Sequence, residues 1–329
     1  MGNKKGVRLP RASKLEKLGL KREWIEPWAL MIDNIDRTGS KTWRLWTQRG
    51  EKLLCRVDWS KEKIGFICAF LDHLGRNGLR YIPRFIQTAD GRRWVSAEDY
   101  SFYLCDYIES LPLNLFDRGQ LEAAFHIMSQ FHRCAESFVP PSESGPGLQR
   151  IPWTKQWEAD LQTLRYYRGL VSDSQKTSAF DELFLEQANI LTSQMDYALR
   201  LLQAADYDQL IDSKGPEIVC HGYFKEPCVR YTIRGDIYID RFDFCHYNLR
   251  TYDLGRFLYR VLANCNWSLS VGQQCLNAYQ ELFPLTNQER RTLAAFLCFP
   301  HPAYAYIRAY YEQRSGCSPK DLAAGLRRE

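Results

Sequence analysis

The chain has 329 residues, of which 45% are hydrophobic and 14% aromatic, and its net charge is +5. This composition excludes an intrinsically disordered protein, and the length favours two lobes or domains. No apolar run approaches the ~20 residues that span a bilayer, so we expect no membrane span. We also expect no secretion, because the first residues lack the apolar core of a signal peptide.

Much of the positive charge lies in residues 1–25, which we expect to form a basic, loosely ordered N-terminal arm. Eight lysines and arginines up to Arg22 are accompanied by a single acid, Glu16. Such an arm can contact anions, but a solvated terminus is the commoner case. The rest of the chain has no RNA-binding signature, so we expect no nucleic-acid partner.

The cysteines favour neither a metal site nor a disulfide framework. Their number, eleven, is odd, and no two of them form a C-x-x-C pair. Several lie in apolar runs and are typical of small core residues in a reducing cytosol, namely Cys68, Cys105, Cys265 and Cys298. We therefore expect no bound metal.

Residues 26–108 predict a small β-rich lobe with one strong helix. A hairpin is expected from Lys41 to Val57, because "TWRLWT" alternates, "QRG" turns and "EKLLCRV" returns. Ser60 is placed to cap a helix whose apolar residues recur at helical spacing, and glycines stop it near Gly75. Further strand-like runs are "RYIPRFIQT", "RRWVS" and "SFYLCDYI".

Residues 109–329 predict a mainly helical lobe. Asp117-x-x-Gln120 resembles a capping box, "SESGPG" is typical of a loop, and a long helix is expected from Ser178 to Leu202. Thr286-x-x-Glu289 caps a further helix, which prolines end. A β-rich lobe followed by a helical lobe predicts an α+β fold of the protein-kinase-like type, with a small N-lobe and a large C-lobe.

The segment from 217 to 261 carries a family resemblance. Its "CHGYFKEPC", "IDRFDF" and "DLGRF" resemble the series H-G-D-x-H-x-x-N, I-D-F-D and D-L-A/G-R-F of aminoglycoside-phosphotransferase-like kinases. The similarity is closest to the spore-coat kinase-like (CotS) family and extends over nearly the whole chain from about Trp43. His221 and Gly222 match the catalytic loop, and Phe242 and Asp243 match the end of the metal motif.

The resemblance also shows where the chemical groups differ. Kinases of this kind use a carboxylate at the nucleophile, an amide and an aspartate on Mg²⁺, and a strand lysine on the phosphates. In this chain the corresponding residues are Tyr223 at the base position, Cys228 at the amide, Arg241 at the metal aspartate and Cys55 at the lysine. Thiols and guanidinium groups do not suit Mg²⁺, and a phenol with pKa near 10 is a poor base.

Neighbouring residues offer weak substitutes. Asp240, Arg56 and Lys52 are expected to point to the opposite face, because an odd shift along a strand turns the side chain over. Glu226 lies three positions beyond the base. His221 and Asp253 correspond to residues that mainly brace such kinases, so the resemblance gives them structural roles.

The resemblance therefore implies a pseudokinase that acts by interaction in sporulation. It would be made in the cytoplasm, attach to the spore coat at the forespore surface and bind spore-coat proteins, with no cofactor; the oligomeric state is left open. One alternative is an ATP- and Mg²⁺-dependent kinase of the aminoglycoside or choline type that uses Asp240, Asp243 and Glu226. Another is a metal-independent anion- or nucleotide-binding module whose degenerate cleft contains Cys55, Arg241 and Asp243.

Overall fold

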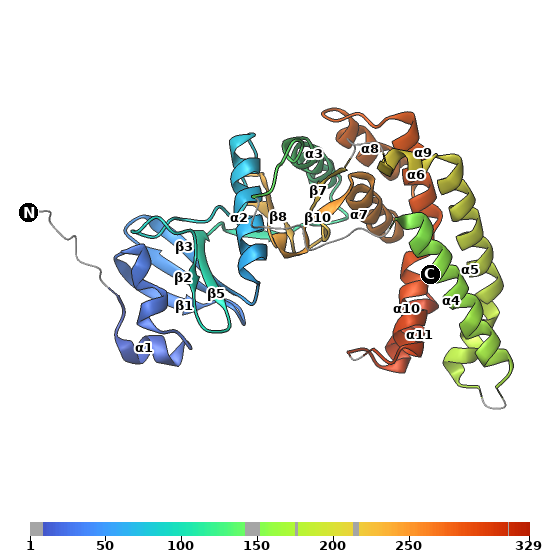
Figure 1. Ribbon diagram of the computed structural model, residues 1–329, viewed down its shortest axis with the longest axis horizontal. Helices are drawn as coiled ribbons and strands as arrows, with labels where there is room; N and C mark the ends of the chain where they lie inside the picture. Colours follow the sequence, from blue (N-terminus) through green and yellow to red (C-terminus); the bar gives the residue numbers. More distant parts are fainter. Residues whose placement is uncertain (1–8, 142–151, 175–176, 213–216, 315) are drawn as a thin grey trace, which may run out of the picture. The chain divides into compact units, whose positions relative to one another are not determined.

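The structure is a computed structural model that describes residues 9–141, 152–174, 177–212, 217–314 and 316–329 (Figure 1). The expected "SESGPG" loop lies outside these residues. The chain divides into two compact units. The first consists of Met1–Leu148, Ile218–His246 and Ser268–Phe283, and the second of Gln149–Glu217, Tyr247–Trp267 and Pro284–Glu329.

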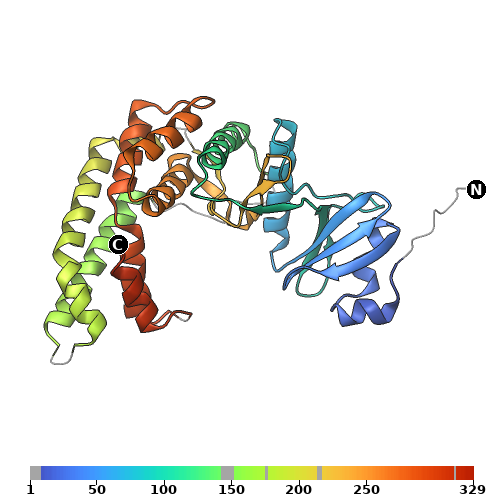
Figure 2. The same cartoon turned by 180° about the vertical axis from the view of Figure 1, so that it is seen from behind.

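The first unit contains a five-stranded antiparallel sheet with the strand order β1-β2-β3-β5-β4, which Figure 2 shows from behind. The strands are β1 (Ile32–Arg37), β2 (Thr42–Thr47), β3 (Gly50–Val57), β4 (Val95–Ser96) and β5 (Ser101–Asp106). The predicted hairpin is confirmed, since Thr42 pairs with Cys55 and Thr47 with Gly50. The run "RYIPRFIQT" forms no strand; Pro83 lies within it and has no N–H to donate to a ladder.

Residues 9–25 differ from the expected loosely ordered arm. They contain α1 (Ala12–Lys17) and η1 (Arg22–Trp24), and η2 (Glu26–Trp28) follows. Leu15, Leu20 and Ile25 are buried in one apolar cluster with Trp43 and Leu54 of the sheet. The prediction of a loosely ordered arm was based on the basic side chains, whereas these apolar residues determine where the segment packs.

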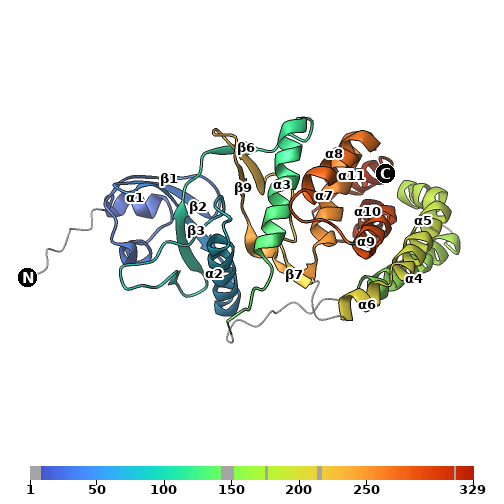
Figure 3. The same ribbon diagram turned by 90° about the horizontal axis from the view of Figure 1, so that it is seen from above.

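Helices and a second sheet complete the first unit. Ser60 caps α2 (Lys61–Arg76) as predicted, and Asp117 caps α3 (Arg118–Cys134), each by accepting a backbone N–H. α3 packs against α8 (Leu269–Gln280), where Ser129 Oγ donates to the carbonyl of Tyr279 (Figure 3). A second sheet of this unit has the order β6-β8-β9, comprising β6 (Ser110–Pro112), β8 (Val229–Thr232) and β9 (Ile237–Ile239).

The second unit is mainly helical. Its α4 and α5 pack side by side, and Figure 3 shows the pair. Capping boxes open α5 at Ser178 and α9 at Thr286, as the sequence predicted, whereas α4 was not predicted. The helices are α4 (Trp153–Ser172), α5 (Ala179–Ala204), α6 (Tyr207–Asp212), α7 (Thr251–Asn264), α9 (Asn287–Cys298), α10 (His301–Tyr311) and α11 (Pro319–Leu326).

The α+β fold class is confirmed, because an antiparallel sheet region is followed by a mainly helical part. Among the described residues, no helix has both the length and the apolar character needed to cross a bilayer.

Candidate functional site

The loop after β7 (Glu217–Cys220) is anchored through His221. This side chain is fully buried, and its Nε2 donates to the carbonyl of Asp240 at 2.7 Å. Its ring packs edge-on against Phe131 of α3 and Phe242 of η3 (Phe242–Phe244), with centroids 6.3 and 5.1 Å away. These contacts fix the loop to α3 and η3, which agrees with the bracing role that the resemblance gave to His221.

Gly222 and Tyr223 shape the tip of this loop. Gly222 has φ +75°, and a Cβ placed on it would lie 2.2 Å from the carbonyl oxygen of Phe244. The Tyr223 ring stacks on Phe244 at 4.7 Å, and the Lys225 ammonium lies 4.0 Å from its centroid. The position that resembles the catalytic base therefore holds a phenol ring between an aromatic ring and a cation.

Cys228 occupies the amide position as a buried thiol. Burial raises the pKa of this thiol to about 11, although the nearby Arg241 opposes the rise. The side chain is therefore protonated at neutral pH. Its backbone carbonyl accepts a hydrogen bond from Asp240 N at 2.8 Å, which ties the two segments together.

Cys55 lies on the face of β3 opposite to Leu54. It is buried and pairs with Tyr103 of β5, whose ring stacks on Phe85 at 4.1 Å. Hydrogen bonding to Cys55 and burial raise the pKa of the Cys105 thiol well above its usual range. Sequence reasoning did not select Tyr103 and Cys105, although the alternation of β5 was a signal that could have placed both beside Cys55.

Lys52 and Arg56 do not replace the missing lysine on this face. Strand alternation places both on the side of Leu54, as the sequence predicted. Lys52 Nζ lies 2.5 Å from the carboxylate of Asp106, and the guanidinium of Arg56 lies 4.9 Å from the centroid of the Tyr100 ring.

Asp240 and Arg241 lie beyond the end of the strand on which the sequence predicted them. Arg241 is exposed in the left-handed region with φ +59°, so strand alternation ends at Ile239. Burial raises the pKa of Asp240. The pKa of Tyr103 is also raised, first by burial, then by the thiols of Cys55 and Cys105, and then by the charge of Asp240. Asp240 is thus the acid that approaches the Cys55 face, while Arg241 N donates to its Oδ1 at 2.8 Å.

The remaining acids do not complete a cluster with Asp240. Asp243 lies in η3 and Glu226 in the loop before β8, and both are half-buried. Within the described part of the chain, the carboxylate oxygens of Asp240, Asp243 and Glu226 do not all lie within 4.8 Å of one another.

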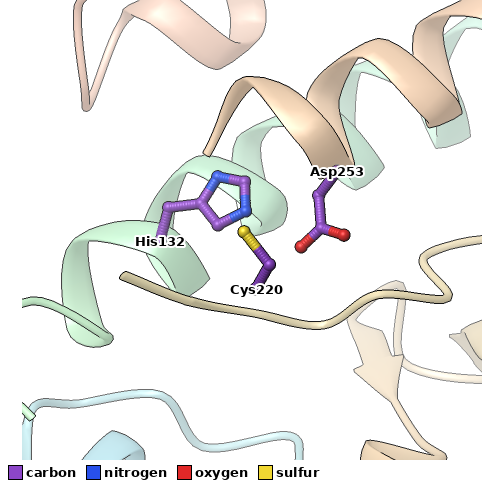
Figure 4. A group of neighbouring side chains, drawn as sticks. All are labelled: His132, Cys220 and Asp253. Carbon is purple, nitrogen blue, oxygen red and sulfur yellow. The ribbon is translucent and has the colours of Figure 1, made fainter. Parts of the chain in front are cut away.

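Three further side chains with polar or sulfur atoms are buried: His132, Cys220 and Asp253. Figure 4 shows His132 on α3, Cys220 on β7 and Asp253 on α7. His132 Nδ1 lies 2.8 Å from the hydroxyl of Tyr279 within the first unit. Asp253 is 1% exposed in the first turn of α7, within the second unit.

The chain is similar in structure to several phosphotransferases. The chain is similar to an aminoglycoside phosphotransferase from Alicyclobacillus acidocaldarius, with a TM-score of 0.82 and 18% identity over 94% of this chain and 90% of that one. A spectinomycin phosphotransferase solved with ADP and spectinomycin gives a TM-score of 0.64 and 12% identity over 97% and 94%. These likenesses show the protein-kinase-like fold.

A sequence relative is named as a spore coat protein. Spore coat protein S of Bacillus subtilis is 26% identical over 281 residues, which cover 84% of this chain and 78% of that protein. Residues 26–328 match the family described as "Spore coat putative kinase YutH". Since this match covers most of the sequence, the chain belongs to that spore-coat, kinase-like family.

Proposed function

We propose that this protein is a pseudokinase that acts by interaction with spore-coat proteins. It is made in the cytoplasm of a sporulating bacterium and attaches to the forespore surface. The carrying observation is that Cys55 and Cys228, which the resemblance aligns with the strand lysine and the metal-binding amide of related kinases, are buried thiols. The relative named spore coat protein S supports the cellular setting.

The donor set does not fit Mg²⁺-ATP. Mg²⁺ requires oxygen ligands in near-octahedral geometry, whereas the amide position offers a protonated thiol at Cys228. Cys55 supplies no cation to a phosphate, and Tyr223 supplies no carboxylate. Asp240 offers a carboxylate beside the Cys55 face, and burial raises its pKa.

Thermal unfolding with ATP, with and without Mg²⁺, tests the absence of nucleotide binding. A ligand at one hundred times its Kd would stabilise the fold by about 2.7 kcal/mol, so binding is easily detected. We expect no shift for the wild type under either condition. The triple variant Cys55→Lys, Cys228→Asn, Tyr223→Asp should gain a shift that requires Mg²⁺. The control is Cys317→Lys, which adds a lysine at an exposed cysteine.

The position of Asp240 favours a second candidate, an ATP-dependent phosphotransferase with rearranged groups. In that case the wild type would be stabilised by ATP only when Mg²⁺ is present, and Asp240→Asn would abolish the effect. Stabilisation by ATP without Mg²⁺ would instead indicate an anion-binding module around Arg241. Either outcome would overturn the pseudokinase proposal.

A separate experiment tests the location. A tagged copy followed through sporulation should concentrate at the forespore surface and be recovered in the coat fraction of purified spores. A uniform cytoplasmic signal throughout sporulation, with no tagged protein in the coat fraction, would contradict the proposed attachment.

A further inference from the structure

A long polar groove runs along α3 and α8 in the first unit. We call it the α3–α8 groove; its cavity measures about 1190 Å³. Residues 78–81 and the turn at Gly235–Asp236 form its other wall. A neighbouring hollow of about 730 Å³ shares His126 and Gln130 with it and extends to Arg133. The α3 residues that line it recur every three or four positions, so one stripe of the helix faces the groove.

The walls of the α3–α8 groove are held by polar contacts. Gln274 Nε2 donates to the carboxylate of Glu122 at 2.5 Å, and His126 Nδ1 lies 3.6 Å from the carboxylate of Glu281. Three further carboxamides line the groove, those of Gln130, Gln273 and Asn277. Carboxamides can pair with the N–H and C=O groups of an extended main chain. Among the described lining residues, Tyr81 is the one aromatic side chain, so the groove lacks a stacking floor for sugars.

The charge of the groove is negative. Glu122, Asp236 and Glu281 line it, and Arg80 is the one cation among its described lining residues, while Arg133 lies in the adjoining hollow. Segment 1–8 of the chain has the opposite character, because Lys4, Lys5 and Arg8 carry positive charge and no acid is present. The two surfaces are therefore electrostatically complementary.

The lengths also agree. From Gly119 to Arg133, α3 rises about 21 Å at 1.5 Å per residue. Eight residues in extended form span about 26 Å. Small residues in the groove, including Gly119, Ala123 and Ala278, leave room for a main chain to approach.

We propose that residues 1–8 of a second copy of this chain bind in the α3–α8 groove. The segment is unsuited to the groove of its own copy, because Leu9 packs with the apolar cluster that contains α1. Figures 1 and 3 show the sheet between α1 and α2, and α3 contacts α2. The apolar cluster that holds Leu9 therefore lies across the sheet and α2 from α3.

Such a contact joins two different surfaces, so each copy keeps one free segment and one free groove. A contact of this kind extends into open chains unless its rotation closes a ring. The inference goes beyond the proposed function, since it holds whether or not the protein phosphorylates a substrate. It gives a coat protein a means of assembling with itself.

Sedimentation velocity over a range of concentrations and salt tests the assembly. The wild type should form species larger than a monomer that dissociate as salt rises. A variant lacking residues 1–8, and the groove variant Glu281→Lys, should each remain monomeric. The matched control Glu186→Lys changes the same charge at an exposed site on α5 and should behave as wild type.

Mixing the two defective variants gives the sharpest result. The variant lacking residues 1–8 keeps an intact groove, and Glu281→Lys keeps an intact segment, so together they should form a 1:1 complex and nothing larger. A labelled peptide of residues 1–8 should bind the truncated protein, and Glu281→Lys in that protein should weaken binding roughly fivefold. A peptide with glutamate in place of Lys4, Lys5 and Arg8 should not bind.

The proposal is overturned if the wild type is monomeric at every concentration and the peptide does not bind. It is also overturned if the truncated variant assembles as the wild type does, or if Glu281→Lys leaves peptide binding unchanged.

Discussion

Replacing Gly222 by alanine should destabilise the first unit strongly, for two separable reasons. The backbone at Gly222 has φ +75°, a left-handed conformation that costs an alanine about 1–2 kcal/mol. The new methyl group would also lie 2.2 Å from the carbonyl oxygen of Phe244 and 2.9 Å from His246 Nδ1. Because a backbone atom cannot rotate away, the η3 turn must shift, which adds about 1–3 kcal/mol as in an overpacked core. The total is about 2–5 kcal/mol.

Gly91→Ala is the matched control. Gly91 has φ +85°, but a Cβ placed there would have no atom within 4 Å, so only the backbone cost applies. Urea unfolding, followed by circular dichroism, gives the free energy of unfolding for each variant. We expect Gly222→Ala to lose clearly more stability than Gly91→Ala. Equal losses would show that the loop accepts a side chain and would refute the close approach to Phe244.

Three further predictions concern buried or exposed groups. Glu289→Ala should cost about 3–5 kcal/mol in urea unfolding, since Arg250 and Glu289 are 6% and 7% exposed and paired at 2.6 Å. Burial alone would raise the pKa of Glu289, but its hydrogen bonds with Arg250 lower the pKa overall. The contribution of this pair to the free energy of unfolding should therefore persist above about pH 4.5 and disappear at lower pH. Burial lowers the pKa of His301 to about 3, so calorimetry should show stability falling as pH drops from about 6.5 towards 3, and less so in His301→Phe. Cys317 is the exposed thiol among the cysteines, so Cys317→Ser should remove the fastest phase of thiol labelling in the native protein.

Helix starts could be predicted from the sequence because their signals are local. Ser60, Ser178 and Thr286 each accept the N–H three residues later, and that geometry needs only the residues of one turn. Glu289 illustrates the limit. It completes the capping box with Thr286, but it also pairs with Arg250, 39 residues away, and nothing in the local pattern indicates that second partner.

The N-terminal segment could not be predicted from charge alone. Its lysines and arginines indicate a solvated terminus, yet Leu15 and Leu20 are buried against the sheet. Only the tertiary fold supplies the apolar surface that these two residues cover, so a prediction confined to the segment weighs the wrong side chains. The run "RYIPRFIQT" before β4 was predicted as a strand and is not one. Its Ile86 N donates a hydrogen bond to the carbonyl of Leu104, but the run forms no continuing ladder.

The candidate site shows the same limit at the level of one residue. Alternation predicted the side chains of Asp240 and Arg241 on opposite faces of a strand, but β9 ends at Ile239 and Arg241 has a left-handed backbone. A left-handed arginine is uncommon and has no local sequence signal. Cys55 differs, because it lies within a regular strand whose pairing could be predicted.

The place of Asp240 bears on the pseudokinase that we propose. Its charge acts on Tyr103, which pairs with Cys55, so the variants that test nucleotide binding leave Arg241 unchanged. At the position that resembles the strand lysine, the chain has the buried thiol of Cys55, which carries no positive charge. Two unit charges about 4 Å apart interact by about 4 kcal/mol at an effective dielectric of 20, before desolvation. Burial raises the pKa of Asp240, and the charges of Arg241 and Arg230 oppose the rise. The pseudokinase that we propose therefore lacks the strand cation that holds nucleotide phosphates in related kinases.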